Sequence, residues 1–147
     1  MADEGSSPPG RSKPLPQCKA LLICEDVFED EVSGQYILHK LIDVLRFSAF
    51  PGDSEPFAIF FQLYDGIGRY EVGIQFYDVS RGESTSSMVI SQLDFTERFA
   101  KIDVALPVDS LRLPRPGQYE LLLLLDGREL ATQTLNAELE DGQEEDE

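Results

Sequence analysis

Short segments in which apolar and polar residues alternate fill most of the chain between residues 18 and 137. The clearest is 69–79, where Tyr70, Val72, Ile74 and Phe76 fall on one face. Alternation with a period of two, in β-branched and aromatic residues, predicts a strand with one buried face. Less regular versions of the pattern predict further strands at 19–24, 35–44, 57–64, 86–92, 99–106 and 118–125, and a last one from about 129.

The segments between these strands carry turn residues. Asp126-Gly127 separates two extended runs and predicts a hairpin, because both central residues of such a turn need a positive φ. The segment 81–84 (RGES) predicts a second turn. The segment 65–68 (DGIG) predicts a hairpin turn, since no helix follows it to make a phosphate site. The segment 93–98 (LDFTER) allows a helical turn between two strands.

About seven or eight short strands without a long helix predict an all-β protein, an antiparallel Ig-like β-sandwich. Leu113, Pro116, Gly117 and Tyr119 have the spacing of a tyrosine corner. In that motif the ring packs at the edge of the core and the hydroxyl bonds to the backbone upstream. This structural role accounts for Tyr119 without any catalysis. The chain has no Trp, so the Cys–Trp–Cys core of true immunoglobulin domains is absent.

Two predicted strands are apolar on both faces. Leu122 and Leu124 lie on the second face of 118–125, and Phe60 and Tyr64 on that of 57–64. A two-layer sandwich buries only one face of each sheet. The second faces must therefore be covered by the segments 41–50 or 93–99, or by another molecule. The latter predicts a surface for a homodimer or a protein partner.

The charge is unevenly distributed. The 147 residues have a net charge of −16, and residues 138–147 hold seven acids and no base. We expect a β-sandwich domain at 18–137, a disordered Pro/Ser/Gly-rich tail at 1–17 and a disordered acidic tail at 138–147. The acidic domain lacks the basic stripe that nucleic acids or an anionic membrane surface would need. No apolar run is long enough to cross a bilayer.

An acidic segment is the first candidate for chemistry: Glu25, Asp26, Glu29, Asp30 and Glu31. Carboxylates are ligands of Ca²⁺, which takes six to eight oxygens. The segment lacks the glycine of an EF-hand loop, so its geometry is unspecified. A Ca²⁺ site at 25–31 and a solvated, charged connection that protects a sheet edge both remain open.

The other reactive side chains are few and dispersed. Cys18 and Cys24 would lie about 20 Å apart along one strand, too far for a disulfide. We expect Cys24 to be a buried core thiol and Cys18 a free surface thiol, as suits the reducing cytoplasm. We expect His39 to be an ordinary, half-exposed strand residue, because no G-x-S-x-G motif accompanies it. The sequence thus predicts no catalytic, cofactor-binding or metal-binding residues.

Two longer stretches, LLICEDVFEDEVSGQYILHKLIDVLRF and PGQYELLLLLDGRELATQTL, open and close the predicted domain. Together they resemble a bacterial family of unknown function, the domain of unknown function number 6941, over about residues 18–139. The resemblance implies an Ig-like sandwich and a bacterial, cytoplasmic setting without an assigned activity. We expect a non-enzymatic, protein-binding or self-associating module. The alternatives are a small-ligand or Ca²⁺-binding sandwich, or an enzyme with a loop-borne site.

Overall fold

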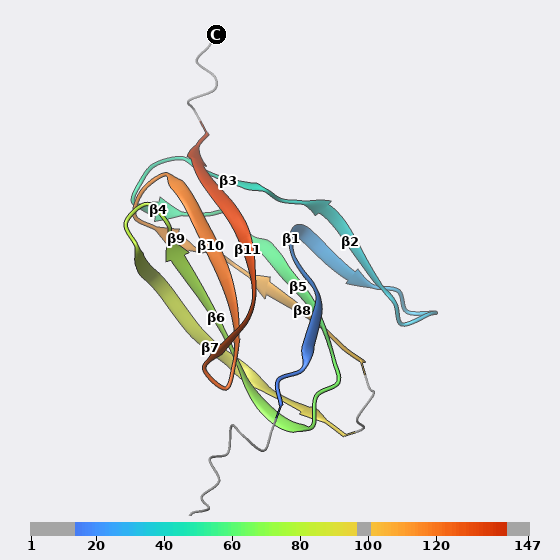
Figure 1. The fold of residues 1–147 in the computed structure, drawn as a ribbon. Coiled ribbons are helices and arrows are strands. Elements are labelled where there is room, and N and C mark those ends of the chain that lie inside the picture. Colours follow the sequence, from blue (N-terminus) through green and yellow to red (C-terminus); the bar gives the residue numbers. More distant parts are fainter. Residues whose placement is uncertain (1–13, 97–100, 141–147) are drawn as a thin grey trace, which may run out of the picture.

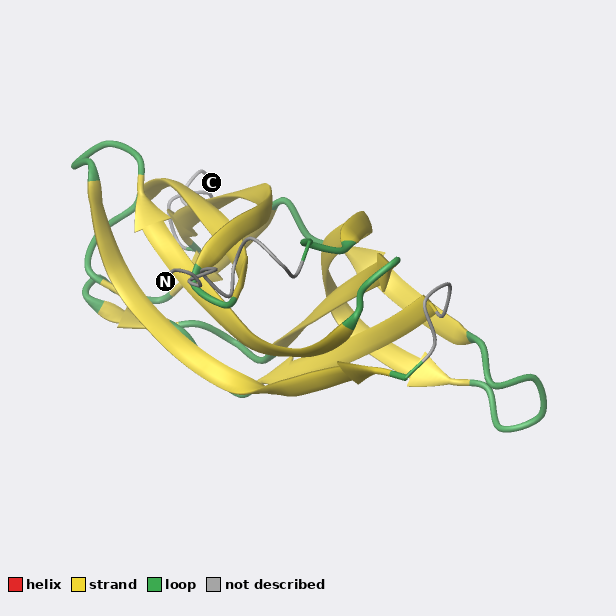
Figure 2. Cartoon of the chain, turned by 60° about the horizontal axis from the view of Figure 1, so that its bottom comes forward, coloured by secondary structure: helices red, strands yellow, loops and turns green. Residues whose placement is uncertain are grey.

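The computed structural model of the protein describes residues 14–96 and 101–140, which form strands and turns with no helix among them (Figures 1 and 2). The strands are β1 (Gln17–Glu29), β2 (Tyr36–Leu41), β3 (Val44–Phe47), β4 (Gly52–Asp53), β5 (Phe57–Tyr64), β6 (Gly68–Asp78), β7 (Glu83–Phe95), β8 (Lys101–Val108), β9 (Arg112–Leu113), β10 (Gly117–Leu125) and β11 (Arg128–Leu139). No described helix could cross a membrane.

The strands form two layers. One sheet has four strands in the order β2-β1-β5-β8, and the other has five in the order β3-β11-β10-β6-β7. A short ladder joins β4 and β9. Among the described strands, all pairings are antiparallel except that of β3 with β11. The predicted all-β, antiparallel Ig-like sandwich is confirmed, with more strands than the seven or eight expected.

The core lies between the two sheets. The apolar face predicted for 69–79 is buried throughout, from Tyr70 to Phe76. It belongs to β6 in the five-stranded sheet, where β10 adds the fully buried Leu121, Leu123 and Leu125. The four-stranded sheet contributes β5 side chains such as Phe61, also fully buried. Each such side chain stabilises the fold by about 1.5–3 kcal/mol relative to an exposed one.

The tyrosine corner is present. The buried Tyr119 donates a hydrogen bond from its hydroxyl to the carbonyl oxygen of Arg115, at 2.7 Å. Arg115 also pairs with the buried carboxylate of Asp78, at 3.0 Å. Burial, with the nearby charge of Asp78, raises the pKa of the Tyr119 hydroxyl. The predicted hairpin turn is present as well, with positive φ at Asp126 and Gly127.

Three predictions about the connections are wrong. The 65–68 segment does not close a hairpin, since β5 and β6 belong to different sheets. The expected single strand at 35–44 is two strands in different sheets, with a φ of 60° at Lys40. The segment 93–98, where a helical turn was possible, is instead extended as far as Phe95, because β7 continues to that residue. Local residue patterns specify extended backbone, but they do not specify the sheet that each strand joins.

The ends of the predicted domain lie within strands. β1 begins at Gln17 and β11 ends at Leu139. Before β1, the Tyr70 hydroxyl donates a hydrogen bond to the carbonyl oxygen of Pro14. Most of the two predicted tails, 1–13 and 141–147, lies outside the described residues, as does 97–100 at the start of the strand predicted at 99–106.

Candidate functional site

A hairpin at residues 25–41 leaves the body of the sandwich, and we call it the arm. It comprises the second half of β1, the turn at 30–35 and β2, and its tip stands clear of the body on the right of Figure 1. Asp30 holds the turn closed: its backbone bonds with Gly34 and Gln35, and its carboxylate accepts the Val32 N–H at 3.0 Å. The acidic segment therefore forms half of a hairpin and its turn, rather than a simple connection.

One face of the arm packs on the body. The rings of Tyr36 and Phe60 lie 5.5 Å apart. Tyr36 pairs with Glu29, whereas Phe60 pairs with Leu22, seven residues earlier on β1. β1 must therefore bend, and the arm folds back over the outer face of the four-stranded sheet. The prediction that 41–50 or 93–99 covers Phe60 is wrong, since β2 provides the cover.

A groove runs beneath the arm. It has a volume of about 450 Å³, and its lining is Gly34, Gln35, Tyr36, Leu38, Phe60, Gln62, Lys101 and Asp103. The side chains of Lys101 and Asp103 form an ion pair at 3.4 Å. The other carboxylate oxygen of Asp103, Oδ1, is buried and has no hydrogen-bond partner within 14–96 and 101–140. The two charged residues that line the groove, Lys101 and Asp103, therefore pair with each other.

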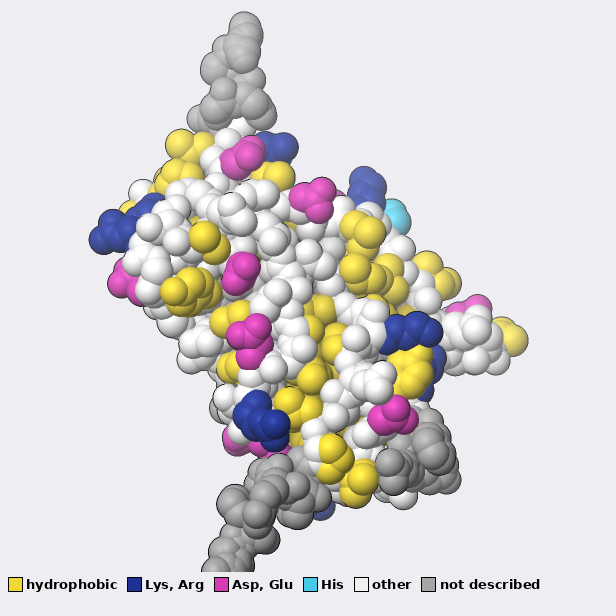
Figure 3. Space-filling model, in the orientation of Figure 1, with side chains coloured by type: hydrophobic (Ala, Val, Ile, Leu, Met, Phe, Trp, Pro, Cys, Tyr) yellow, Lys and Arg dark blue, Asp and Glu magenta, His cyan; other side chains and the backbone are white. Residues whose placement is uncertain are grey.

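The opposite face of the arm is apolar and exposed. Phe28 and Ile37 lie directly across the ladder from each other, and their exposed fractions are 52% and 54%. Leu41 on the same strand is 64% exposed, and Val32 at the turn is 96% exposed. These four are half of the large, exposed apolar residues in the described chain. Figure 3 shows apolar side chains on the right-hand part of the molecule, where the arm lies.

The arm also carries uncompensated negative charge. Residues 25–41 include five acids and only one base, Lys40. Among the described residues, none of these five acids is within ion-pair distance of a Lys or Arg. In the body, by contrast, Arg46, Arg112 and Arg115 each pair with an acid. The arm thus combines exposed apolar side chains with acidic ones that pair with no described Lys or Arg.

His39 lies in the middle of this exposed face. Its Nδ1 is 3.8 Å from Glu25 Oε1 and 4.0 Å from Asp26 Oδ2, and all three side chains are about half exposed. Their donor atoms lie within 4.8 Å of one another. Hairpin register brings His39 to these acids, whereas Glu29, Asp30 and Glu31 lie toward the tip. The structure thus separates the acids of the predicted Ca²⁺ segment into two groups. A set of one imidazole and two carboxylates suits a transition-metal ion better than Ca²⁺, which prefers oxygen ligands.

Neither cysteine has the surroundings of a reactive thiol. Both are free, as expected. Cys24 is fully buried, and burial followed by the charge of Asp26 raises its pKa. Cys18 is half-buried against the core rather than at the surface, and burial raises its pKa too. A raised pKa lowers the thiolate fraction, and the thiolate is the nucleophile.

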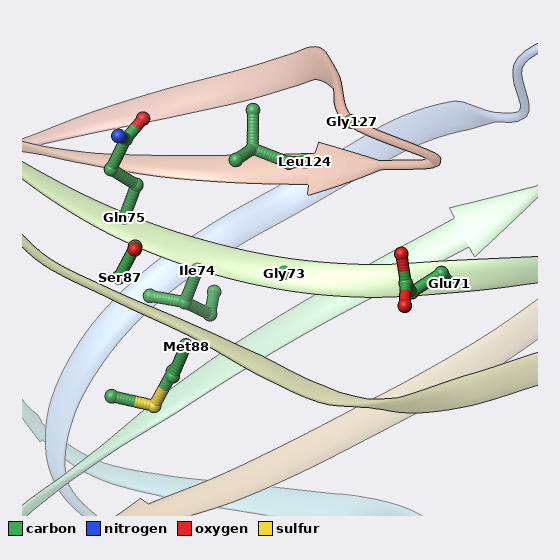
Figure 4. A pocket seen from close by; sticks show the side chains of 8 residues that line it. All are labelled: Glu71, Gly73, Ile74, Gln75, Ser87, Met88, Leu124 and Gly127. Atoms are coloured by element: carbon green, nitrogen blue, oxygen red, sulfur yellow. The ribbon is translucent and has the colours of Figure 1, made fainter.

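A shallow hollow marks the outer face of the five-stranded sheet (Figure 4). It holds about 270 Å³ beside Gly73, and its lining includes Gln75, Ser87 and Leu124. The hollow exists because Gly73 contributes no side chain between its neighbours on β7 and β10. Leu122 and Leu124, predicted to need a cover, are half-buried here. This face is therefore less exposed than the arm.

Comparison with known proteins gives a family for the chain. Residues 19–138 match the model of a family of unknown function, DUF6941, and the chain belongs to that family. No curated protein matches the chain.

Several solved structures are similar to the chain. The alkylpurine DNA glycosylase AlkC of Pseudomonas fluorescens, bound to DNA with an abasic site analog, matches 84% of this chain with a TM-score of 0.53 and 14% identity. An immunoglobulin-like protein of Pseudomonas aeruginosa matches 84% with a TM-score of 0.44 and 12% identity, over 97% of its own length. A β-glucosidase of Listeria innocua matches 84% with a TM-score of 0.44 and 7% identity. The chain spans 30% of the glycosylase and 16% of the glucosidase, so these matches concern the sandwich alone.

Proposed function

We propose that the chain is a non-enzymatic protein-binding module and that the exposed face of the arm is its binding surface. One observation carries this proposal: Phe28, Ile37 and Leu41 are all more than half exposed, on a hairpin whose other face is packed. Exposed apolar side chains grouped on one surface are typical of protein interaction sites. Singly scattered ones would need no such explanation.

The position of these side chains strengthens the argument. β2 is an edge strand, and natural edge strands usually carry charges, prolines or bulges that prevent association. β2 carries one such charge, Lys40, but Ile37 and Leu41 on the same strand are apolar and exposed, and Phe28 extends the apolar surface across the ladder. They contribute little to the core, so the fold alone gives no reason for them to be apolar.

The charge of the arm favours a different protein over a second copy of this chain. Two arms brought together would place ten acids beside two lysines. Like charges placed together at an interface are unfavourable, and complementary charges speed association. A partner with a basic surface therefore fits the arm better than the arm itself, and self-association becomes an outcome of the test.

The proposed module has no enzymatic role. Support comes from the surroundings of the candidate groups: both thiols have raised pKa values, and the Tyr119 hydroxyl is engaged in the corner. Two free thiols also support a cytoplasmic location, which we propose alongside the binding role.

A photo-crosslinking experiment tests the binding role. A photoreactive amino acid replaces Ile37 on the arm in one version of the full chain, and Thr132, exposed on β11, in a matched control. Irradiation of cells that express the chain should give a covalent adduct with another protein from position 37 and none from position 132. An adduct of twice the chain's mass would show self-association instead. Equal adducts from both positions would show that the arm is not the binding surface.

A further inference from the structure

We infer that the segment bound by the arm is an extended, basic stretch of the partner that pairs with β2 as an additional strand. This inference rests on the proposed function and specifies the partner's chemistry. Strand addition is an established mode of peptide recognition, in which main-chain hydrogen bonds supply affinity and alternate side chains supply specificity.

The edges of the two sheets differ in how they resist such pairing. β8 carries Pro107, which lacks an N–H. β7 has two register irregularities, and β3 has only four residues. β2 has no proline, its ladder with β1 keeps one register, and Lys40 is the only Asp, Glu, Lys or Arg in its six residues. Among the described edges, β2 is the one least protected against a further strand.

The backbone sets the length of the available edge. Lys40 has a φ of 60°, and the Glu25–Lys40 pair is missing from the ladder. A strand with regular geometry can therefore pair along 36–39. Successive side chains point to opposite faces of a strand. A partner strand would thus extend the exposed face at Ile37 with one set of side chains, and the groove-side face of Tyr36 and Leu38 with the other.

The negative charge of the arm indicates which charged side chains the partner strand should carry. Glu29, Asp30 and Glu31 lie at or beside the turn, and Glu25 and Asp26 lie on β1 near His39. Long basic side chains on an added strand could reach these carboxylates, which have no Lys or Arg partner in the described part of the chain. An acidic strand would instead meet five like charges. The geometry and the charge together point to alternating apolar and basic residues.

The test titrates the isotope-labelled full chain with a capped, nine-residue peptide in which lysine alternates with valine. Binding is followed by amide chemical shifts and by hydrogen exchange of the 36–39 amides. One control peptide replaces every lysine with glutamate. A second keeps the lysines but carries N-methyl groups on alternate amides, so that it has the same charge and cannot form a ladder.

We expect the lysine peptide to bind, to slow exchange at 36–39, and to bind about tenfold more weakly in about 0.5 M salt, because salt screens exposed charges. We expect both control peptides to bind at least about tenfold more weakly than the lysine peptide. The glutamate peptide lacks the favourable charge, and the N-methylated peptide lacks the main-chain hydrogen bonds. Equal binding by the N-methylated peptide would overturn strand pairing, and equal binding by the glutamate peptide would overturn the basic preference. If no peptide binds but position 37 still gives an adduct with a partner, the inference fails and the proposed function stands.

Discussion

The body of the sandwich and the arm are built from the same kind of alternating strand, yet they place their apolar faces differently. In the body, Ile74 and Leu123 point into the core and are fully buried. In the arm, Phe28 and Ile37 also lie side by side across a ladder, but no described residue covers them. Alternation therefore identifies a strand with two unlike faces. A second layer on the apolar side decides whether that face stabilises the fold or remains available for binding.

The body and the arm also differ in whether their acidic side chains are paired with basic ones. Asp78 in the body is buried and bonded to Arg115 and to the Arg81 backbone N–H. The acids of the arm have no Lys or Arg partner among the described residues. Charge in the body thus contributes to a fixed structure, whereas charge in the arm contributes to the field that a partner meets.

The largest difference is expected from one substitution made in both regions. Leu123→Ala in the body should lower the free energy of unfolding by about 2–5 kcal/mol, because it leaves a cavity in a close-packed core. Leu41→Ala in the arm should change it by less than about 0.5 kcal/mol, as is usual at exposed positions. Urea denaturation of the two variants measures both values. Similar decreases in the free energy of unfolding would show that the arm's apolar face belongs to the hydrophobic core.

Neutralising one acid in each region should give the next largest difference. Asp78→Asn removes the buried charge of an ion pair and should cost about 1–3 kcal/mol, because Asn offers Arg115 only a weaker, uncharged hydrogen-bond partner. Glu29→Gln on the arm should have no measurable cost, or a slight gain from reduced repulsion. Both are measured by urea denaturation at neutral pH. A cost at Glu29 equal to that at Asp78 would show that the arm's acids have structural partners.

The tyrosine corner should give a smaller effect that depends on pH. Tyr119→Phe removes one hydrogen bond and should cost about 1 kcal/mol near pH 7. The pKa of this hydroxyl is raised in the folded protein, so its contribution is complete below the ordinary tyrosine pKa and is lost as pH rises above about 10. The stability gap between wild type and variant should therefore narrow in alkali. Tyr36→Phe on the arm serves as the control. A stability gap between wild type and Tyr119→Phe that widens as pH rises would contradict the proposed role of the Tyr119 hydroxyl.

Metal addition should have the smallest effect. Glu25, Asp26 and His39 offer three half-exposed donors, fewer than the six to eight oxygens that Ca²⁺ takes. We therefore expect about 1 mM Ca²⁺ to leave the Tm within about 1 °C of its value in EDTA, because only ligands that bind the folded state raise stability. Thermal melting in the two buffers measures this. A clear rise that Glu25→Gln abolishes would restore the Ca²⁺ hypothesis for 25–31.

Sequence reasoning succeeded where the determining interactions are local. The Asp126-Gly127 turn and the Tyr119 corner each depend on a few neighbouring residues, and both are present. It failed where distant segments decide the outcome. The 35–44 stretch is apolar enough for a single strand, but it divides between two sheets. The bend in β1 that folds the arm over Phe60 has no local signature either.

The candidate site was only partly predictable for the same reason. The acidic segment and the single histidine were visible, but their approach depends on the register of β1 with β2. Surplus apolar residues were also visible, on 57–64 and 118–125. The most exposed apolar side chains lie instead on 28–41, where the sequence suggested a charged connection followed by an ordinary strand. Composition revealed surplus apolar surface without locating it.

The arm's apolar face, on the reasoning above, serves binding and not folding. The most direct test of this role is the photo-crosslink from position 41 of the full chain in the producing cells, with and without the double substitution Phe28→Ser and Ile37→Ser. We expect an adduct with another protein that disappears in the double variant, although the variant unfolds at the same urea concentration. An adduct that persists in the double variant, or no adduct from position 41 at all, would contradict the claim.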